Sequence, residues 1–316
     1  MIAAPWHDGE RAAQARGGTA ERMVEIGPRV IRDFMPEQHR QFFEQLPFIV
    51  VGSLDTEQRP WASIVAGMPG FASSPHPKRL EIEANPLPGD PLNDALAVGN
   101  TLGVLGIELP TRRRNRMNGQ IVGRDMAGFA VHVRESFGNC PQYIQRRDYT
   151  AFAPKTGAVE AFTALAADAV DLIRRADTMF VASAAPLVDG KSSEDGKFSV
   201  DVSHRGGQPG FLGLDRDGAI VVPDFRGNGF FQTIGNLLAY PRAGLLIPDF
   251  ATGDLLQVTG TAEVIWDGPE VEAYSGAERL WKVKVQSGRW LRAGFPLRFG
   301  EPELSPRSLA VGVYGG

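Results

Sequence analysis

Residues that could hold a small anion gather in the second half of the chain. In PDFRGN (223–228) a β-type run ends before a helical pattern begins, so Arg226, the amide of Gly227 and Asn228 could converge on a phosphate at a helix N-terminus. Thr233 and Asn236 share one face of that helix and could add hydrogen bonds. A structural interpretation stays open, in which Arg226 and Asn228 cap the helix and the other two are ordinary polar positions.

Three further positions extend this candidate anion site. Arg205 precedes the glycine-rich segment GGQPG, where a backbone without side chains can come close to a ligand. Pro223 and Asp224 end the strand that leads to Arg226. We therefore predict that Arg205, Pro223 and Asp224 line the same site.

A second basic feature, TRRRNRMNG (111–119), lies in the first half of the chain. If this segment is a strand, Arg112, Arg114 and Arg116 point to one face and Arg113 to the other. One interpretation is a contribution to the anion site. The other is a solvated loop or a cluster of ion pairs with acidic residues, and the sequence leaves both open.

Cys140 is the single cysteine, in FGNCPQYIQRR. Pro141 favours the first turn of a helix, and a thiol at a helix N-terminus near Arg146 and Arg147 could have a lowered pKa. A buried small residue is the alternative interpretation.

The composition argues against several classes of protein. The 316 residues include 33 Lys+Arg and 37 Asp+Glu, a net charge of −4, which argues against a dedicated nucleic-acid or anionic-membrane surface. One cysteine allows no intrachain disulfide, and we expect a cytoplasmic protein. We find no apolar run near the roughly 20 residues of a membrane span, no secretory signal, and no histidine pair with zinc-site spacing.

Glycine and proline, at 37 and 23 residues, separate many short β-type runs. This pattern predicts a mainly β fold with a few helices, of the α+β class. We expect strands over 48–54, 61–66, 80–84 and 101–109, and helices over 36–46, 90–98 and 157–175.

The chain also contains an internal repeat. GMPGF (67–71) returns as GQPGF (207–211), 140 residues later. LGVLGIEL (102–109) and MNGQIVG (117–123) match AGLLIPDF (243–250) and VTGTAEV (258–264), each 141 residues later. Matches in one order at a nearly constant offset indicate a duplicated small barrel. We predict an N-terminal arm over 1–35, a first copy over 36–155 and a second copy over 156–316.

The two copies differ at the candidate anion site. Where the second copy has DFRGN, the first has NPLPGD, which lacks the Arg–Asn pair and brings Asp90 to the corresponding place. A carboxylate there would repel a dianion. We therefore predict that the first copy has diverged and that the second keeps the site.

Three strings of the second half are distinctive: DVSHRGGQPGF (201–211), IVVPDFRGNGFFQTIGNLLAYPRAGLLIPDF (220–250) and LLQVTGTAEV (255–264). Through these strings the second half resembles the FMN-binding split-barrel family related to pyridoxamine 5'-phosphate oxidase. The first half is similar to a branch of predicted flavin-nucleotide-binding proteins, through MPEQHRQFF, LPFIVVG, LGVLGIELPTRRRNRMNG and ESFGNCPQYIQRRD. Two departures are Tyr240, where Asn is usual, and a C-terminal segment without the Arg/His substrate signature of the oxidase.

The resemblance implies two tandem split barrels that form an intramolecular pseudo-dimer and bind FMN. It assigns the phosphate to Arg205, Arg226, Asn228 and Thr233, and the flavin ring edge to Gln257. Because the barrels of this family pair across the flavin, Arg116 of the first copy could also reach it.

The function that this resemblance implies is an FMN-dependent oxidoreductase acting on a small substrate. NAD(P)H or a separate reductase would supply electrons, since the fused ferredoxin-reductase-like part of longer relatives is expected to be missing. The protein would be a monomer or a homodimer, with no nucleic-acid or membrane partner. The alternative is a carrier or sensor that binds a flavin or tetrapyrrole without turnover.

Overall fold

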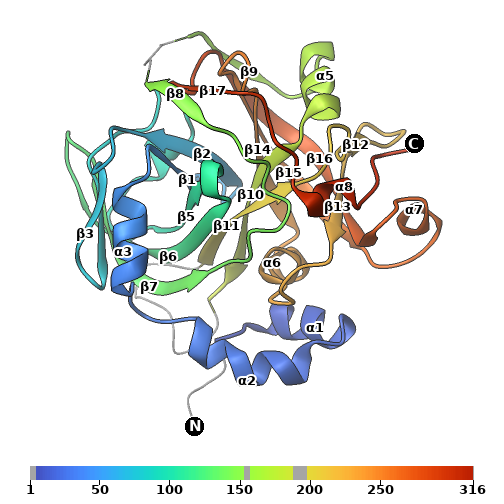
Figure 1. Cartoon of the computed structure of the whole chain (residues 1–316), viewed down its shortest axis with the longest axis horizontal. Helices are drawn as coiled ribbons and strands as arrows, with labels where there is room; N and C mark the ends of the chain where they lie inside the picture. Colours follow the sequence, from blue (N-terminus) through green and yellow to red (C-terminus); the bar gives the residue numbers. More distant parts are fainter. Residues whose placement is uncertain (1–4, 153–156, 188–197, 316) are drawn as a thin grey trace.

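The computed structural model describes residues 5–152, 157–187 and 198–315. Two antiparallel sheets stand side by side, with the first half of the chain in one and the second half in the other (Figure 1). The fold is mainly β with a few helices, as predicted. It consists of two tandem split barrels packed as an intramolecular pseudo-dimer.

Among the described residues, the first sheet has seven strands in the order β2-β1-β5-β6-β7-β4-β3. Their bounds are β1 Phe48–Leu54, β2 Pro60–Ala66, β3 Ala72–His76, β4 Arg79–Ile82, β5 Thr101–Glu108, β6 Arg113–Arg124 and β7 Phe129–Gly138. Helix α3 (Glu37–Glu44) precedes this sheet, α4 (Leu92–Ala95) joins β4 to β5, and the 3₁₀ turn η1 (Leu109–Thr111) joins β5 to β6.

The second sheet repeats this plan with the order β11-β10-β14-β15-β16-β13-β12. Its strands are β10 Thr178–Pro186, β11 Phe198–Gly206, β12 Gly213–Leu214, β13 Ile220–Phe225, β14 Arg242–Pro248, β15 Leu255–Ile265 and β16 Ala277–Leu291. Helix α5 (Ala167–Arg175) precedes it, α6 (Gln232–Ala239) joins β13 to β14, and α7 (Pro269–Glu272) lies before β16. If β10–β16 are renumbered as strands 1–7 of the second copy, their order is 2-1-5-6-7-4-3, the same as in the first copy. The internal repeat of the sequence therefore corresponds to a repeated strand order in the structure.

Local details repeat as well. The sheet pairing shifts at Asn118/Gly119 in β6 and at Thr259/Gly260 in β15, two matching positions of the repeat. The turns GMPGF and GQPGF each place a positive-φ glycine, Gly70 or Gly210, before a buried phenylalanine.

The two sheets meet through apolar side chains from both copies, including Phe48, Val50 and Leu105 of the first and Phe180 of the second. Matching glycines allow this close approach. A Cβ on Gly103 would lie 2.7 Å from the carbonyl oxygen of Val200, and one on Gly244 would lie 2.2 Å from that of Pro60. The contact between copies therefore requires glycine at these positions of β5 and β14.

The N-terminal arm folds into two helices, α1 (Asp8–Arg16) and α2 (Ala20–Val30), and α1 packs against α6 of the second copy. Gly9 and Gly235 make the approach possible, because a Cβ on Gly9 would lie 2.2 Å from the Gly235 carbonyl oxygen. Trp6 and Met23 of the arm join a small core with Phe137 of the first copy and Phe230 of the second. The arm thus contacts both barrels.

The helix predicted over 157–175 is wrong in its first half. Strand β9 (Val159–Phe162) pairs with β16, and the helix begins only at Ala167. Phe162 lies against Gly288, where a Cβ would meet its ring at 2.2 Å. This pairing with a distant strand overrides the helical propensity of the Ala-rich segment. The predicted boundary between copies, at 155, lies outside the described residues.

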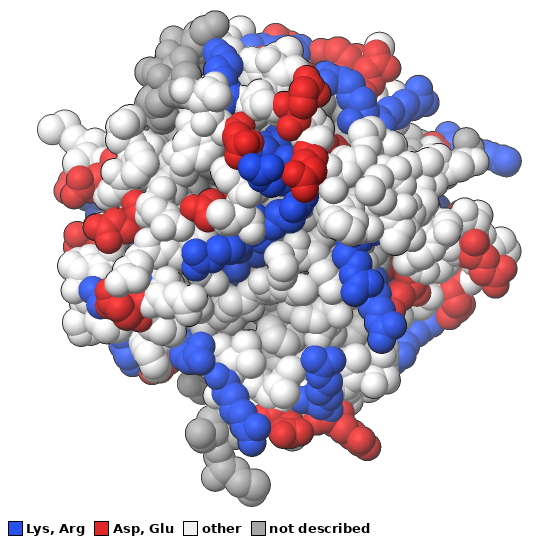
Figure 2. All heavy atoms as spheres, in the orientation of Figure 1, with Lys and Arg blue, Asp and Glu red and all other residues white. Residues whose placement is uncertain are grey.

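The chain end returns to the second copy and its junction with the first. Strand β17 (Leu297–Phe299) pairs with β8 (Tyr149–Phe152), and α8 (Pro306–Leu309) follows. Within the described residues, no helix is long and apolar enough to cross a membrane. The face in Figure 2 mixes basic and acidic side chains without a large area of one sign.

Candidate functional site

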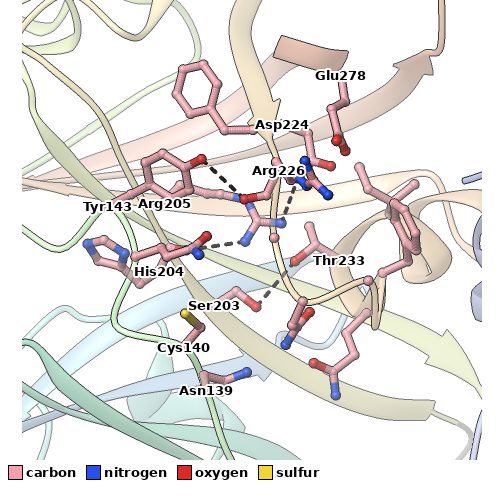
Figure 3. A pocket seen from close by; sticks show the side chains of 18 of the residues that line it. Asn139, Cys140, Tyr143, Ser203, His204, Arg205, Asp224, Arg226, Thr233 and Glu278 are labelled. Carbon is pink, nitrogen blue, oxygen red and sulfur yellow. Dashed lines mark hydrogen bonds and ion pairs between the residues drawn. The ribbon is translucent and has the colours of Figure 1, made fainter. Parts of the chain in front are cut away.

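A pocket of about 380 Å³ opens where three parts of the chain meet. The first copy contributes Arg114 and Arg116 of β6 and residues 139–143. The second copy contributes the end of β11, the segment 223–229 and the first turn of α6, and the arm contributes residues 17–19 and Arg22. Figure 3 shows side chains from β11, β13 and α6 around this pocket.

The structure brings most of the predicted anion-site residues together here. Seven of the nine line the pocket: Arg116, Arg205, Pro223, Asp224, Arg226, Asn228 and Thr233. Six of them belong to the second copy and come from β11, β13, α6 and the loop before α6, whereas Arg116 of β6 is brought to the pocket by the pairing of the two copies.

Asn236 and Gln257 do not line this pocket. The Asn236 side chain donates to Ser183 and Asp201 at 3.0 Å each and pairs with His7 of the arm at 2.8 Å. Gln257 is fully buried and its Nε2 donates to the carbonyl oxygen of Ala62 at 2.9 Å. Asn236 lies one helical turn beyond Thr233, under the arm, and Gln257 faces the first copy.

The segment before α6 has a backbone that leaves the helix N-terminus open. Asn228 uses its Oδ1 to accept from the amide of Phe230 at 3.0 Å, and Gly229 adopts a φ of +83° beside Thr19 of the arm. Phe231, at the N-cap of α6, is in the left-handed region at φ 60° and provides no side-chain cap. The first amides of α6 therefore have no capping side chain and lie at the pocket.

Positive charge dominates the pocket wall. Six arginines line it against two acids, Asp224 and Glu278. Asp224 bridges Arg205, at 3.4 Å, and Arg279, and Glu278 also pairs with Arg279 at 3.0 Å. The remaining arginines are Arg22, Arg114, Arg116 and Arg226. The wall therefore has a net positive charge that a bound anion would neutralise.

Arg116 is the one of these four that has an internal counterion. Its Nη2 donates to Asp201 at 2.6 Å and its Nη1 to Gln232 at 2.6 Å. Burial lowers the pKa of Arg116, while Asp201 acts in the opposite direction. Arg116 therefore ties the first copy to α6 of the second while lining the pocket.

Arg22, Arg114 and Arg226 form no ion pair within the described part of the chain. Arg22 and Arg226 are exposed, whereas Arg114 is half-buried. Burial and the nearby positive charges of Arg205 and Arg116 lower the pKa of Arg114 to about 9. Arg114 remains predominantly protonated at neutral pH, since this value is still above 7.

Several buried polar atoms around the pocket have no hydrogen-bond partner among the described residues. They include Nε of Arg116, Arg205 and Arg279, Nε2 of His204 and Oδ1 of Asn139. Burial, followed by the charges of Arg114 and Arg205, holds the pKa of His204 well below its ordinary value, so its ring is neutral. Such groups are costly when unsatisfied, so a polar ligand or water belongs in this pocket.

The prediction that Arg112, Arg114 and Arg116 share one face of a strand is correct only for the last two. Arg114 and Arg116 share the face of β6 that lines the pocket, but Arg112 lies before the strand with a left-handed φ of 57°. Arg112 instead donates to the Ile144 carbonyl oxygen at 3.0 Å and pairs with Glu303. The alternation of side chains along a strand therefore does not extend to Arg112.

Cys140 is exposed and lines the pocket, but the helix predicted after it does not form. Tyr143 adopts a left-handed φ of 62° and turns the chain there. The stacked rings of Tyr143 and Phe225, with centroids 5.4 Å apart, make an aromatic wall between the copies.

The contributors to the pocket that sequence reasoning missed include Arg22, Tyr143 and Arg279. The sequence does indicate an inward position for Arg279. It lies two and four residues before the buried Trp281 and Val283 in β16, so all three side chains are on the same face of the strand. Arg22 and Tyr143 reach the pocket through the folding of the arm and a turn, which no local pattern indicates.

The matching place in the first copy is filled by the chain itself. Asp90 is buried and accepts from Ser63 at 2.6 Å and from the amide of Leu92, the first residue of α4, at 2.8 Å. It also accepts from Gln257 of the second copy at 3.0 Å. Burial is the main cause that raises the pKa of Asp90 to about 6, against these hydrogen bonds.

No protein-family model and no curated protein matches this sequence. Among solved structures, HupZ from Group A Streptococcus is similar over 42% of this chain and 98% of its own, with 18% identity and a TM-score of 0.30. A candidate 5-nitroimidazole antibiotic resistance protein from Bacteroides thetaiotaomicron is similar over 49% of this chain and 96% of its own, with 14% identity and a TM-score of 0.27.

Proposed function

We propose that the pocket binds FMN and that the protein is an FMN-dependent oxidoreductase. The observation that carries the proposal is the uncapped N-terminus of α6, which opens into a pocket lined by six arginines. Main-chain amides at a helix N-terminus and guanidinium groups are the donors that a phosphate dianion requires. The sequence resemblance to FMN-binding split barrels specifies which phosphate ligand we expect.

The residues present fit such a ligand. Thr233 places its hydroxyl in the first turn of α6, 3.3 Å from the hydroxyl of Ser203, and Arg226 lines the same pocket without an ion-pair partner among the described residues. We assign the phosphate to these groups and to Arg205, whose buried Nε has no partner. Asn228 holds the loop that carries Arg226 through its bond to the Phe230 amide.

The aromatic side chains of Tyr143, Phe225 and Phe231 line the same pocket and could shield a flat ring from water. FMN when bound would supply hydride or electron transfer, while the protein supplies binding and electrostatics. A ring surrounded by arginines would be easier to reduce, because positive charge stabilises the extra electron density.

Fluorescence titration of FMN tests the binding site. We expect wild-type protein to quench the flavin, and Arg226→Gln to weaken binding about 10-fold, the equivalent of about 1.4 kcal/mol, through loss of one charge-assisted contact. Arg124→Gln, at the far end of β6 and outside the pocket lining, is the matched control. Absence of FMN binding would refute the proposal. Unchanged FMN affinity in Arg226→Gln would show that the phosphate does not bind at the N-terminus of α6.

Anaerobic reduction separates an enzyme from a carrier. If NADH or NADPH is the donor, the visible absorbance of the bound flavin should disappear on its addition. Bleaching by dithionite but by neither nicotinamide would leave two functions, an oxidoreductase served by a separate reductase and a non-catalytic flavin module. Reduction by an added flavodoxin or ferredoxin reductase, followed by reoxidation with an organic acceptor under anaerobic conditions, would favour the enzyme.

A further inference from the structure

We propose that Arg114 binds the carboxylate of a small planar substrate, at a subsite separate from the phosphate site at α6. This inference deepens the proposed function, since it specifies the chemical class of the second ligand of the same pocket. It rests on how Arg114 is held, on the missing counterion and on the character of the wall beside it.

Two carbonyl groups fix the guanidinium of Arg114 within the pocket. Its Nε donates to the carbonyl oxygen of Cys140 at 2.9 Å, and its Nη1 lies 3.4 Å from both Nδ1 and the carbonyl oxygen of His204. Nη2 has no hydrogen bond within the described residues. An arginine restrained on one side with donors free on the other loses little further side-chain entropy when it binds an anion.

Arg114 also differs from the other half-buried or buried arginines of the pocket. Arg116 has Asp201, and Arg205 and Arg279 share Asp224, but Arg114 has no acidic partner in the described part of the chain. A half-buried cation without a counterion is unfavourable in the free protein. An anionic ligand supplies the missing charge, so the pocket selects for one.

The wall next to Arg114 belongs to the first copy and to β11, away from the N-terminus of α6. Figure 3 shows Cys140 and His204 on one side of the pocket, with Thr233 and Glu278 on the other. A single small phosphate at α6 would therefore leave the Arg114 side to a second group. Strand β11 borders both subsites, through His204 beside Arg114 and through Ser203 and Arg205 at the phosphate. Arg114 itself comes from β6 of the first copy and Thr233 from α6 of the second, and we assign these two ends of the pocket to different ligands.

Tyr143 lies between the two subsites, since its hydroxyl donates to the carbonyl oxygen of Arg226 at 3.2 Å, and it can contact both the flavin ring and the planar part of the substrate. Its ring lines the pocket, close in sequence to Cys140, and stacks on Phe225 with an interplanar angle of 29°. The neutral ring of His204 adds no second positive charge. The Arg114 guanidinium suits a carboxylate, and the Tyr143–Phe225 pair in the same pocket offers an aromatic face to a flat organic group.

Calorimetric titration with benzoate and its neutral analogue benzamide tests the inference, with and without FMN at one fixed ionic strength. We expect benzoate to bind wild-type protein at least about 10-fold more tightly than benzamide, since only benzoate forms the charge-assisted pair. Arg114→Gln should remove this preference, and Arg114→Lys should restore part of it. Arg113→Gln, on the opposite face of β6 against Phe42, should keep it.

The outcomes separate this inference from the proposed function. Loss of benzoate preference in Arg114→Gln with FMN affinity within twofold of wild type supports the separate subsite. Equal binding of benzoate and benzamide to wild-type protein overturns the inference, whether or not FMN binds, and does not require any variant to fold. Loss of FMN binding together with benzoate binding in Arg114→Gln would also overturn it, because one site would then serve both ligands. Benzoate binding without any FMN binding would instead refute the proposed function alone.

Discussion

The helices α4 and α6 occupy matching places in the two copies, and each begins beside a serine of a neighbouring strand. In the first copy Ser63 donates to Asp90, whose carboxylate also accepts from the amide of Leu92, the first residue of α4. In the second copy Thr233 donates to Ser203, and no side chain caps α6. One copy thus carries its own buried carboxylate where the other opens to a pocket of arginines. We infer that duplication allowed one site to become structural while the other kept an anion.

A second pair of residues connects each copy to the other. Arg116 and Gln257 are 141 residues apart and take equivalent places on β6 and β15. Arg116 reaches Gln232 and Asp201 of the second copy, and Gln257 reaches Ser63 and Asp90 of the first. We call the arginine-lined pocket of the second copy the open site and the place of Asp90 in the first copy the closed site. The charged Arg116 pairs with the carboxylate of Asp201 at the open site, and the neutral Gln257 donates to Asp90 at the closed site.

Removing these two cross-copy residues should give the largest effects on stability, and unequal ones. Arg116→Met leaves the buried carboxylate of Asp201 without its cation and should lower the free energy of unfolding by about 3–5 kcal/mol. Gln257→Met removes a neutral donor and should cost about 1–3 kcal/mol. Urea denaturation of flavin-free protein measures both. Equal losses would contradict the difference in charge that we assign to the two sites.

The pH dependence of stability should report on the closed site. Because the pKa of Asp90 is raised to about 6 from 3.8, the folded state binds the proton more tightly than the unfolded state. Its contribution is fully present below about pH 4 and is lost as the pH rises through about 6. Wild type should therefore lose about 3 kcal/mol relative to Asp90→Asn between pH 3 and pH 7. Parallel stability curves for the two proteins would show that folding does not shift the pKa of Asp90.

A carboxylate introduced at the open site, like that of Asp90 at the closed site, should strongly weaken FMN binding. Thr233→Asp places a carboxylate beside Ser203, as Asp90 lies beside Ser63, and should weaken FMN binding about 100-fold, or about 2.7 kcal/mol, by repulsion of the phosphate. Thr233→Asn has the same shape without the charge and serves as the control, with a loss below about 10-fold. If the two variants bind FMN equally, charge at this position does not decide the difference between the copies.

Much of this comparison could be predicted from the sequence, because it depends on order and local chemistry. The repeated strings predicted one strand plan used twice, which the strand order confirms. The difference between NPLPGD and DFRGN placed Asp90 in the first copy and the Arg–Asn pair in the second, and which copy keeps an anion site stays a prediction. Arg205, Arg226 and Thr233 follow strand ends or begin a helix, where local pattern is informative.

What could not be predicted depends on contacts between distant segments. The alternation of β15 indicates that Gln257 faces inward, but not that the facing group is Asp90 of the other copy. Similarly, the helical pattern places Asn236 on the face of Thr233, whereas burial under His7 follows from the docking of the arm. The strand β9 was also missed because it forms through pairing with the distant strand β16, which the Ala-rich local sequence does not indicate.

The central claim, that one copy holds an anion site and the other has closed it, is tested most directly by the stoichiometry of FMN binding. The measurement is an equilibrium dialysis of the purified protein against FMN, with bound flavin quantified by its visible absorbance. The account predicts one FMN per chain for wild type, one for Asp90→Asn and none at the same concentration for Thr233→Asp. Two FMN per chain, or one that persists in Thr233→Asp, would contradict it.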